Sequence, residues 1–439
     1  MTSAFFGLQT SLRGLLAQQQ AIDVTGHNVA NANTPGYSRQ EAVLAPTRPY
    51  VIPQGNSVNT GAGAQLGSGV DVSAIRRIRD QFLDLQYRAQ QMSLGDATAR
   101  TTSLDQVELA FAEPTDDGLA AQLASFWDAW SDVANAPENA GARAALVATA
   151  QTLGTTFRTI HQQLTTVAQQ AQDEFDAITG TNGEIAGMAS ELAGLNRAIG
   201  DAVFRGQQPN DLMDRRDQLL DRLSALGQVS VTDTGDSRYR VDFGGVTLVD
   251  PSIPAGYTWP QTLRAPGGKL GALLDLASAT GPALTYRDQL DAVADDLVRS
   301  VNALHTSTPF FDARGTRADT IAVVVTEATV QTGSGRAAGE NDVAQAIARL
   351  RGGTTDQLYQ GLVARIGTES QAAVRGEATA RSLVNAVEDR RQSVAGVSLD
   401  EEMTNLIRFQ RGYQASARTM TTIDEMLETL ITRTGRVGL

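Results

Sequence analysis

The residue types that most often carry out chemistry are scarce in this sequence and far apart. Three histidines, His27, His161 and His305, fall in three different predicted elements, and the chain has no cysteine and no H-E-x-x-H motif. Metal sites need ligands grouped at short spacing, so we expect no metal site. Each histidine is predicted to be a surface or half-buried polar residue.

One acidic triplet matches a catalytic motif. Asp233-Thr234-Gly235 has the form of the aspartic protease triplet, but that chemistry needs two aspartates that share a proton. The triplet lies between two predicted strands, where Asp-x-Gly is common turn chemistry. The glycine-rich stretch 61–69 lacks G-x-G-x-x-G, and residues 267–269 lack the first glycine of a P-loop. The sequence therefore predicts neither an enzyme nor a cofactor site.

The charge is negative overall and unevenly distributed. The 439 residues carry a formal net charge of -13, which disfavours nucleic acid or an anionic membrane as a main partner. Residues 1–50 hold three arginines and two acids, and residues 397–439 hold five arginines and six acids, so both ends are close to neutral. Near-neutral ends suit self-association, while the acidic middle keeps the rest of the chain apart and soluble.

The apolar runs in the sequence are short. The longest, residues 321–325, is far too short to span a membrane. No apolar stretch follows the first basic residue, Arg13, so we expect no cleaved secretory signal. If the protein leaves the cell, we expect an export route that does not depend on a cleaved secretory signal.

Two terminal stretches carry the spacing of coiled-coil helices. Residues 397–432 open with a capping box, Ser398 and Glu401, and residues 3–31 precede an asparagine-rich turn. Apolar residues at alternating steps of three and four are typical of a narrow coiled-coil seam. The seam of the first helix contains Phe5, Leu8, Leu12, Leu15, Gln19, Ile22, Gly26 and Val29, and that of the last contains Leu399, Met403, Leu406, Gln410, Tyr413, Ala417, Met420, Ile423, Leu427 and Leu430. We predict that the two helices pair, and we hypothesise that Gln19 and Gln410 fix the register.

The region after the first helix has an extended pattern. Its asparagines and the Pro-Gly pair predict a chain reversal at residues 28–37. Residues 38–51 are predicted to be extended, residues 54–69 to form a glycine-rich connector, and residues 70–75 to form a short strand. Helical periodicity resumes at Arg76 and continues, with a break at residues 113–118, to about residue 133.

The longest periodic segment predicts a helical rod. The seam from residue 146 to residue 202 is apolar except at Glu174 and Thr181. One unbroken helix over this seam would be about 84 Å long. A turn at residues 206–210 and a second helix at residues 211–226 complete a long helical hairpin.

Later segments add a small β region and further helices. Alternation at residues 229–231 and 239–243, with Gly244-Gly245 as a two-residue hairpin turn, predicts strands. The remaining predicted elements are helices at 269–279, 282–305 and 355–394 and one strand at 321–326.

The predicted fold is mainly α, and α+β overall, with discontinuous, nested domains. The predicted domains are a terminal coiled-coil domain (residues 1–50 and 395–439), a helical rod (51–227 and 270–394, with an extended connector at 51–75) and a small β insertion (228–269). We expect the β insertion at the tip of the rod, and residues 307–345 could join it.

Three segments resemble the axial proteins of the bacterial flagellum. The run NVANANTPGYSRQ at residues 28–40 resembles the signature shared by flagellar rod, hook and hook-associated proteins. Residues 397–431 resemble the closing helix of the same family. Within the family, residues 409–411, 423–427 and 211–223 are most similar to the hook-associated members.

The resemblance implies a structural subunit of the flagellum that is not an enzyme. Members of this family pair their terminal helices to line an axial tube and carry a helical rod outside it. They are exported unfolded by the flagellar type III apparatus to the cell exterior, without a cleaved signal. A hook-associated member implies self-assembly at the hook–filament junction, with hook protein on one side and hook-associated protein 3 on the other. An export chaperone would hold the C-terminal helix, and neither nucleic acid binding nor membrane insertion is implied.

The implied subunit interface comprises both helical seams and the turn that follows the first helix. The turn contributes Asn28, Asn31, Pro35, Gly36 and Tyr37. Another axial subunit, a hook or distal rod protein, is the alternative, although hook proteins are dominated by β domains and rod proteins lack a long heptad rod. An effector or hydrolase with axial termini would need a metal or nucleophile cluster within the inserted region, and a soluble coiled-coil module would not need paired terminal seams.

Overall fold

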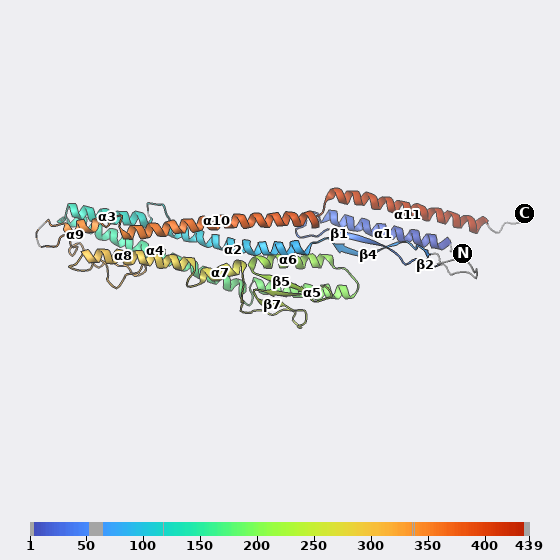
Figure 1. Cartoon of the computed structure of the whole chain (residues 1–439), viewed down its shortest axis with the longest axis horizontal. Coiled ribbons are helices and arrows are strands. Elements are labelled where there is room, and N and C mark those ends of the chain that lie inside the picture. The colour runs from blue at the N-terminus through green and yellow to red at the C-terminus, as the bar shows by residue number, and fades with distance from the viewer. Residues whose placement is uncertain (1–3, 52–64, 117, 336, 338, 434–439) are drawn as a thin grey trace, which may run out of the picture.

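The molecule is a long, slender rod of helices that run nearly along one axis, and both chain ends lie at the same end of it (Figure 1). The computed structural model describes residues 4–51, 65–116, 118–335, 337 and 339–433. Its mainly α fold with small antiparallel sheets confirms the predicted fold class. No helix within these described stretches is both long enough and apolar enough to span a membrane.

The end that carries both termini consists of two helices and a two-stranded ribbon. α1 (Ala4–Ala30) lies beside α11 (Leu399–Arg433). β1 (Gln40–Pro46) pairs antiparallel with β4 (Val70–Arg77), and β2 (Tyr50–Val51) pairs with β3 (Gln65–Leu66). The pairing of the terminal helices and the extended segments are thus confirmed. Most of the predicted connector at residues 54–69 lies outside the described residues.

The body of the rod is a bundle in which the chain travels to the far end and back. α2 (Gln81–Phe111) runs outward beside α10 (Thr354–Ala395), which returns toward the termini (Figure 1). The other helices of the bundle are α3 (Leu119–Asn135), α4 (Ala140–Thr179), α7 (Gly268–Ala277), α8 (Pro282–Leu304) and α9 (Asp342–Ala348). β4 continues to Arg77, so the helix predicted to start at Arg76 begins at Gln81.

The predicted unbroken rod helix is in fact two helices. α4 ends at Thr179, and α5 (Glu184–Phe204) begins after a glycine-containing turn. The two polar seam positions, Glu174 and Thr181, are exposed beside this break, whereas most of the seam on either side is buried. The indole N–H of Trp259 donates to the carbonyl of Thr179 at 3.1 Å and so satisfies one of the free carbonyls that end α4. The apolar periodicity of the sequence does not reveal the break, because residues on both sides of it, such as Ile178 and Ile185, pack into the same core.

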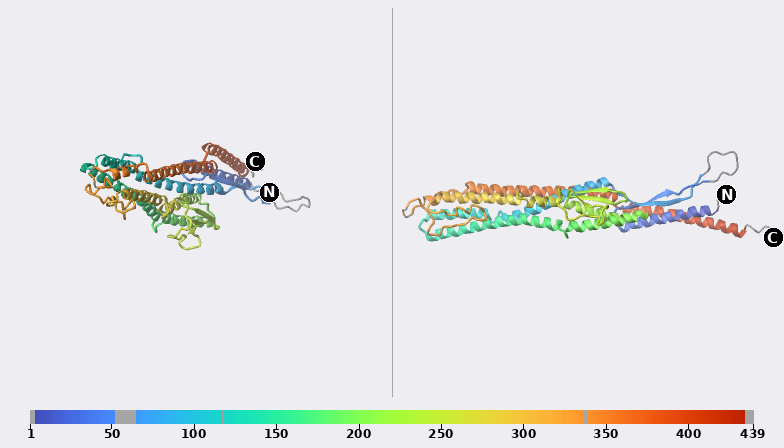
Figure 2. Two further views of the ribbon diagram at one scale, coloured as in Figure 1. Left: turned by 60° about the vertical axis from the view of Figure 1, so that its left-hand side comes forward. Right: turned by 90° about the horizontal axis from the view of Figure 1, so that it is seen from below.

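The β insertion is a three-stranded antiparallel sheet, in the order β5 (Val229–Asp233), β6 (Tyr239–Phe243) and β7 (Val246–Val249). The predicted strands and hairpin are confirmed. The backbone N–H of Gly235 donates to the Asp233 carboxylate at 2.9 Å, so the acidic triplet forms a turn. The sheet packs against α5 and α6 (Asn210–Leu226) along the side of the rod, and the expectation that it lies at the tip is wrong (Figures 1 and 2).

The far end of the rod has an aromatic core. The fully buried rings of Phe126, Trp127, Trp130, Phe310 and Phe311 have neighbouring centroids 4.9–6.4 Å apart. Burial of each such side chain contributes about 1.5–3 kcal/mol. Two of the rings come from the segment between α8 and α9, so this segment belongs to the far core and does not join the β insertion.

The strand predicted at residues 321–326 does not form. A single bridge joins Phe311 to Val323. Ile321 and Val325 are buried in the far core, so the apolar run that resembled a strand packs against helices instead. Short apolar runs carry this ambiguity because burial alone does not fix the backbone conformation.

Two of the three histidines are more buried than the sequence indicated. His161 and His305 are buried, and only His27 is exposed. Nε2 of His305 accepts a hydrogen bond from the backbone N–H of Gln331 at 2.7 Å, and Nδ1 contacts the carbonyl oxygen of Thr308. Burial lowers the pKa of His305 below its ordinary value of 6.5, so the ring is neutral at physiological pH.

We expect the rod to lose stability as the pH falls below about 6.5. The unfolded chain then binds a proton at His305 that the folded chain does not bind, because the pKa of His305 is lowered by folding. Between about pH 7 and about pH 5, the melting temperature of His305→Gln should fall less than that of the unsubstituted chain. Melting curves with equal pH dependence would contradict this assignment.

Candidate assembly domain

α1 and α11 approach each other through small residues. Gly7 lies opposite Ile423, where an added Cβ would be 3.1 Å from the isoleucine side chain. Gly14 lies opposite Ser416 at the same distance of 3.1 Å. The buried side chains of α1 are also small or polar: Ser11, Ala17, Ala21, Val24, Thr25 and Asn28. Glycine permits this close approach because it has no side chain, so the contact also uses small residues that lie outside the predicted apolar seam.

The predicted interface residues lie mostly on the outside of this helix pair. Asn28 is buried. The half-buried ones are Leu8, Leu15, Ile22, Asn31, Tyr37, Leu406, Met420, Ile423 and Leu427. The exposed ones are Phe5, Leu12, Gln19, Val29, Pro35, Gly36, Leu399, Met403, Gln410, Tyr413 and Leu430. The two seam glutamines are therefore on the surface of the pair, and the large apolar seam side chains divide equally between exposed and half-buried positions.

The side chain of Asn28 joins three segments of the chain. Its amide nitrogen donates to the carbonyl of Gln40 at 2.8 Å and to the Glu402 carboxylate at 3.1 Å. Its amide oxygen accepts from the backbone N–H of Gln40 at 2.9 Å and from the Tyr37 hydroxyl at 2.8 Å. All four hydrogen-bonding positions of this amide are therefore filled. Burial, together with the charges of Asp211, Asp214 and Glu402, raises the pKa of Tyr37 and keeps its phenol a donor.

Arg39 fastens the same turn to the start of α11. Its Nε donates to Glu402 at 2.8 Å, and its terminal nitrogen donates to Glu401 at 2.7 Å. The Glu401 N–H lies 3.5 Å from the Ser398 hydroxyl, so half of the predicted capping box is present. The Glu401 carboxylate binds Arg39 instead of completing the box. The side chain of Glu402 is 2% exposed and that of Glu401 is 62% exposed, so only the first of these pairs is shielded from water.

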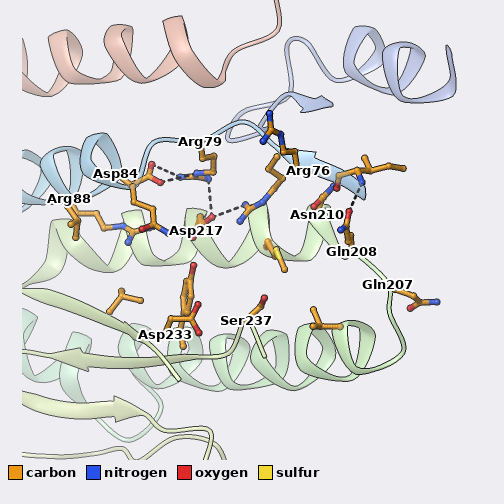
Figure 3. A pocket seen from close by; sticks show the side chains of 18 of the residues that line it. Arg76, Arg79, Asp84, Arg88, Gln207, Gln208, Asn210, Asp217, Asp233 and Ser237 are labelled. Carbon is orange, nitrogen blue, oxygen red and sulfur yellow. Dashed lines mark hydrogen bonds and ion pairs between the residues drawn. The ribbon is translucent and has the colours of Figure 1, made fainter. Parts of the chain in front are cut away.

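A second polar cluster fastens the terminal domain to the rod, and Figure 3 shows the part of it that Arg79, Asp84, Arg88 and Asp217 form. It consists of Arg77, Arg79, Arg88 and Arg391 with Asp84, Asp214, Asp217 and Asp221. Arg79 binds Asp84 of α2 at 2.6 Å and Asp217 of α6 at 3.1 Å. Ser38, in the turn after α1, donates its backbone N–H (3.0 Å) and its hydroxyl (2.7 Å) to Asp214. The terminal domain and three rod helices therefore meet at one cluster of balanced charge.

Burial and opposite charge act against each other in this cluster. Burial by itself raises the pKa of Asp217, but the guanidinium groups of Arg79, Arg77 and Arg88 outweigh it and lower the pKa below its ordinary value of 3.8. The cost of desolvating such pairs is comparable to their attraction, so an intact pair adds little net stability. Removal of one partner leaves a buried charge and costs about 3–5 kcal/mol.

Sequence reasoning missed both polar clusters. The acidic positions of α6 recur every three or four residues, at Asp211, Asp214, Asp217 and Asp221. That spacing places acids on one face of a helix and could have predicted a charged contact. No comparable signal links Asn28 to Glu402, because 374 residues separate them in the sequence.

Models of flagellar protein families match both ends and the body of the chain. The model described as flagellar hook-associated protein FlgK helical domain matches residues 104–258. A flagella basal body rod protein model matches residues 8–37, and a flagellar basal body rod FlgEFG protein C-terminal model matches residues 391–433. The two terminal matches cover the helix pair and its joint. The terminal domain is therefore of the class found in flagellar axial proteins.

Relatives that match along the whole chain indicate which family of axial proteins this chain belongs to. Flagellar hook-associated protein 1 of Bacillus subtilis (strain 168) is 30% identical, over 100% of both chains. Flagellar hook-associated protein 1 of Escherichia coli (strain K12) is 25% identical, over 97% of this chain and 99% of the relative. The solved flagellar hook junction protein FlgK from Burkholderia pseudomallei is 25% identical over 50% of this chain and 43% of that chain, with a TM-score of 0.40. The chain belongs to the family of flagellar hook-associated protein 1, a family of structural proteins of the flagellum.

The two glutamates beside Arg39 provide a matched test of the joint. Glu402→Ala should destabilise the terminal helix pair by about 3–5 kcal/mol, because it leaves Arg39 and Asn28 without a buried acceptor. Glu401→Ala should cost at most about 1 kcal/mol, because its pair is exposed. Hydrogen exchange of the α1 and α11 amides measures both effects. Equal loss of protection in the two variants would show that the buried contact does not hold the helices together.

Proposed function

We propose that this chain is a non-enzymatic structural subunit at the junction between the flagellar hook and the filament. The observation that carries the proposal is the terminal helix pair, which is closed by small residues and carries large apolar side chains on its outside. Membership of the hook-associated protein 1 family supports the place in the flagellum. The terminal domain, residues 1–50 and 395–439, contacts neighbouring subunits, and the rod lies outside it.

The outward apolar side chains form the proposed subunit interface. Six that are exposed in the isolated chain are Leu12, Leu16, Met403, Ile407, Met426 and Ile431. Complete burial of one such side chain contributes about 1.5–3 kcal/mol. The contact between α1 and α11 buries mainly small groups and so gains little from this effect. Neighbouring copies that cover the outer side chains would supply the missing apolar contact.

The proposed partners follow from the position in the axis. Copies of this chain contact one another through the terminal domain, with hook protein on one side and hook-associated protein 3 on the other. The apolar outer face of α11, which includes Met403 and Ile407, is the proposed binding surface for an export chaperone inside the cell. Export through the flagellar type III apparatus, without a cleaved signal, then delivers the chain to the cell exterior.

The alternatives are less well supported. A hook or distal rod protein would share the terminal helices, since basal body rod models match residues 8–37 and 391–433. Residues 104–258, however, match the helical domain of a hook-associated protein, and the two relatives matched along the whole chain are hook-associated proteins. For an enzyme, the densest group of ionisable residues would be the first candidate site. That group is the cluster of four arginines and four aspartates, which are paired with one another.

Charged substitutions on the outer face should prevent assembly without unfolding the monomer. Leu12→Asp and Ile407→Asp place a carboxylate where a neighbour is proposed to bury an apolar side chain, at a cost of several kcal/mol. Each variant should fail to restore motility in a strain that lacks this chain, although its circular dichroism spectrum is unchanged. Leu109→Asp, at a leucine of α2 that is even more exposed (77%, against 44% for Leu12 and 47% for Ile407), is the control and should restore motility. Full motility with both Leu12→Asp and Ile407→Asp would contradict the proposed interface.

The junction itself is tested by deletion. A strain that lacks this chain should build hooks and release flagellin monomers into the medium, because the filament has no subunit on which to begin. Electron microscopy of the cells and immunoblotting of the medium measure these two outcomes. Hooks that carry normal filaments would overturn the junction role, and the absence of hooks would favour a hook or rod subunit.

A further inference from the structure

Three potential metal ligands meet on the side of the rod near its far end. His161 lies in α4, Asp291 lies in α8, and Asp319 lies in the segment between α8 and α9. One ligand atom from each residue can be chosen so that all three atoms lie within 4.8 Å of one another. The distance from His161 Nε2 to Asp291 Oδ1 is 3.9 Å. Three segments that are distant in sequence thus direct imidazole and carboxylate groups to one point.

His161 has an unused nitrogen at this point. The residue is only 8% exposed, and its Nε2 is buried without a hydrogen-bond partner. The 3.9 Å that separate it from Asp291 are too long for a hydrogen bond. Most buried polar atoms in proteins have a partner, so an orphaned imidazole nitrogen that faces two carboxylates needs an explanation. A bound cation would accept the lone pair of Nε2 and neutralise the carboxylates together.

Arg317 occupies part of this space in the structure. Its Nε lies 3.0 Å from Asp291 Oδ2 and 3.6 Å from Asp319 Oδ1. The guanidinium group balances the carboxylates, but it makes no hydrogen bond to Nε2 of His161, which stays without a partner. The side chain of Arg317 is 54% exposed, so it can turn into solvent when another cation binds. The backbone N–H of Ala318 donates to Asp291 Oδ1 at 2.9 Å and holds that carboxylate toward the site.

We propose that His161, Asp291 and Asp319 bind a divalent transition-metal ion of the zinc type. One imidazole and two carboxylates suit such an ion better than Ca²⁺ or Mg²⁺, which prefer oxygen ligands alone. Bonds of about 2.0–2.2 Å would require the three ligand atoms to approach to about 3.3–3.6 Å of one another. Asp319 is exposed on a connecting segment and can make this movement. A water molecule would complete the coordination.

The site would hold the segment between α8 and α9 against the bundle. Arg158 of α4 already donates to the carbonyl of Ile321 in this segment at 2.8 Å. A metal ion bound to Asp319 would add a second attachment beside it, from the same helix and from α8. The expected effect is a more rigid far end, remote from the terminal domain and independent of the proposed subunit contacts.

The test is metal binding by the full chain after removal of metal with a chelator. Isothermal titration with Zn²⁺ should show one site, and Co²⁺ should give the visible absorption of a low-symmetry site with nitrogen and oxygen ligands. His161→Gln and Asp319→Asn should each weaken Zn²⁺ binding roughly tenfold or more. Arg317→Gln should strengthen it, because the competing cation is removed. Asp319→Asn changes an exposed side chain and keeps the test valid if His161→Gln does not fold.

A control variant distinguishes binding at this site from non-specific Zn²⁺ binding by other histidines. His27→Gln removes an exposed histidine that lies 4.0 Å from the Asp211 carboxylate, and it should leave Zn²⁺ binding unchanged. The proposal would be overturned if the unsubstituted chain bound no Zn²⁺ detectably at millimolar concentration. It would also be overturned if His161→Gln or Arg317→Gln left the Zn²⁺ affinity equal to that of the unsubstituted chain. Zinc should also raise the melting temperature of the unsubstituted chain but not that of the chain with Asp319→Asn.

Discussion

The buried amide of Asn28 is the interaction on which the terminal domain depends. The chain turns after α1 at residues 31–39, and it returns from the rod to the terminal domain at the start of α11; this amide binds both places. Each of its hydrogen bonds, if left unmade in a buried site, would cost about 1–3 kcal/mol. The partners on the turn and on Glu402 must therefore be in place together. This requirement makes the joint cooperative although the residues come from opposite ends of the sequence.

Polar and apolar contacts have different roles in this protein. Within the chain, the terminal domain is positioned by hydrogen bonds, by Arg39 and by the cluster of arginines and aspartates, all of which demand particular geometry. Buried pairs of this kind are screened by salt less than exposed pairs. Many large apolar side chains of α1 and α11 are exposed instead, and apolar contacts of this kind are non-directional. In the rod, most of the apolar side chains are enclosed in two cores.

The sequence allowed most elements to be predicted, since periodicity and turn residues are local signals. The pairing of the terminal helices was predicted correctly, but the close approach at Gly7 and Gly14 was missed because neither glycine lies on the apolar seam. The break after Thr179 was missed because the core contact continues through it. The apolar run that begins at Ile321 was taken for a strand because a packed coil has the same composition. The spacing of the aspartates in α6 indicates a charged helix face, but the arginines that bind it, and the contacts of Asn28, depend on long-range contacts that no local spacing encodes.

The helix pair of the terminal domain is fixed mainly at the end that adjoins the rod. The contacts of Asn28 and Glu402 lie next to the rod, whereas the contacts farther out at Gly14 and Gly7 are made by residues that have no side chain to interlock. Displacement of the helix pair under load is therefore smallest at the joint and grows toward the chain ends. The free end of the pair can bend without breaking the hydrogen bonds that hold its other end to the rod.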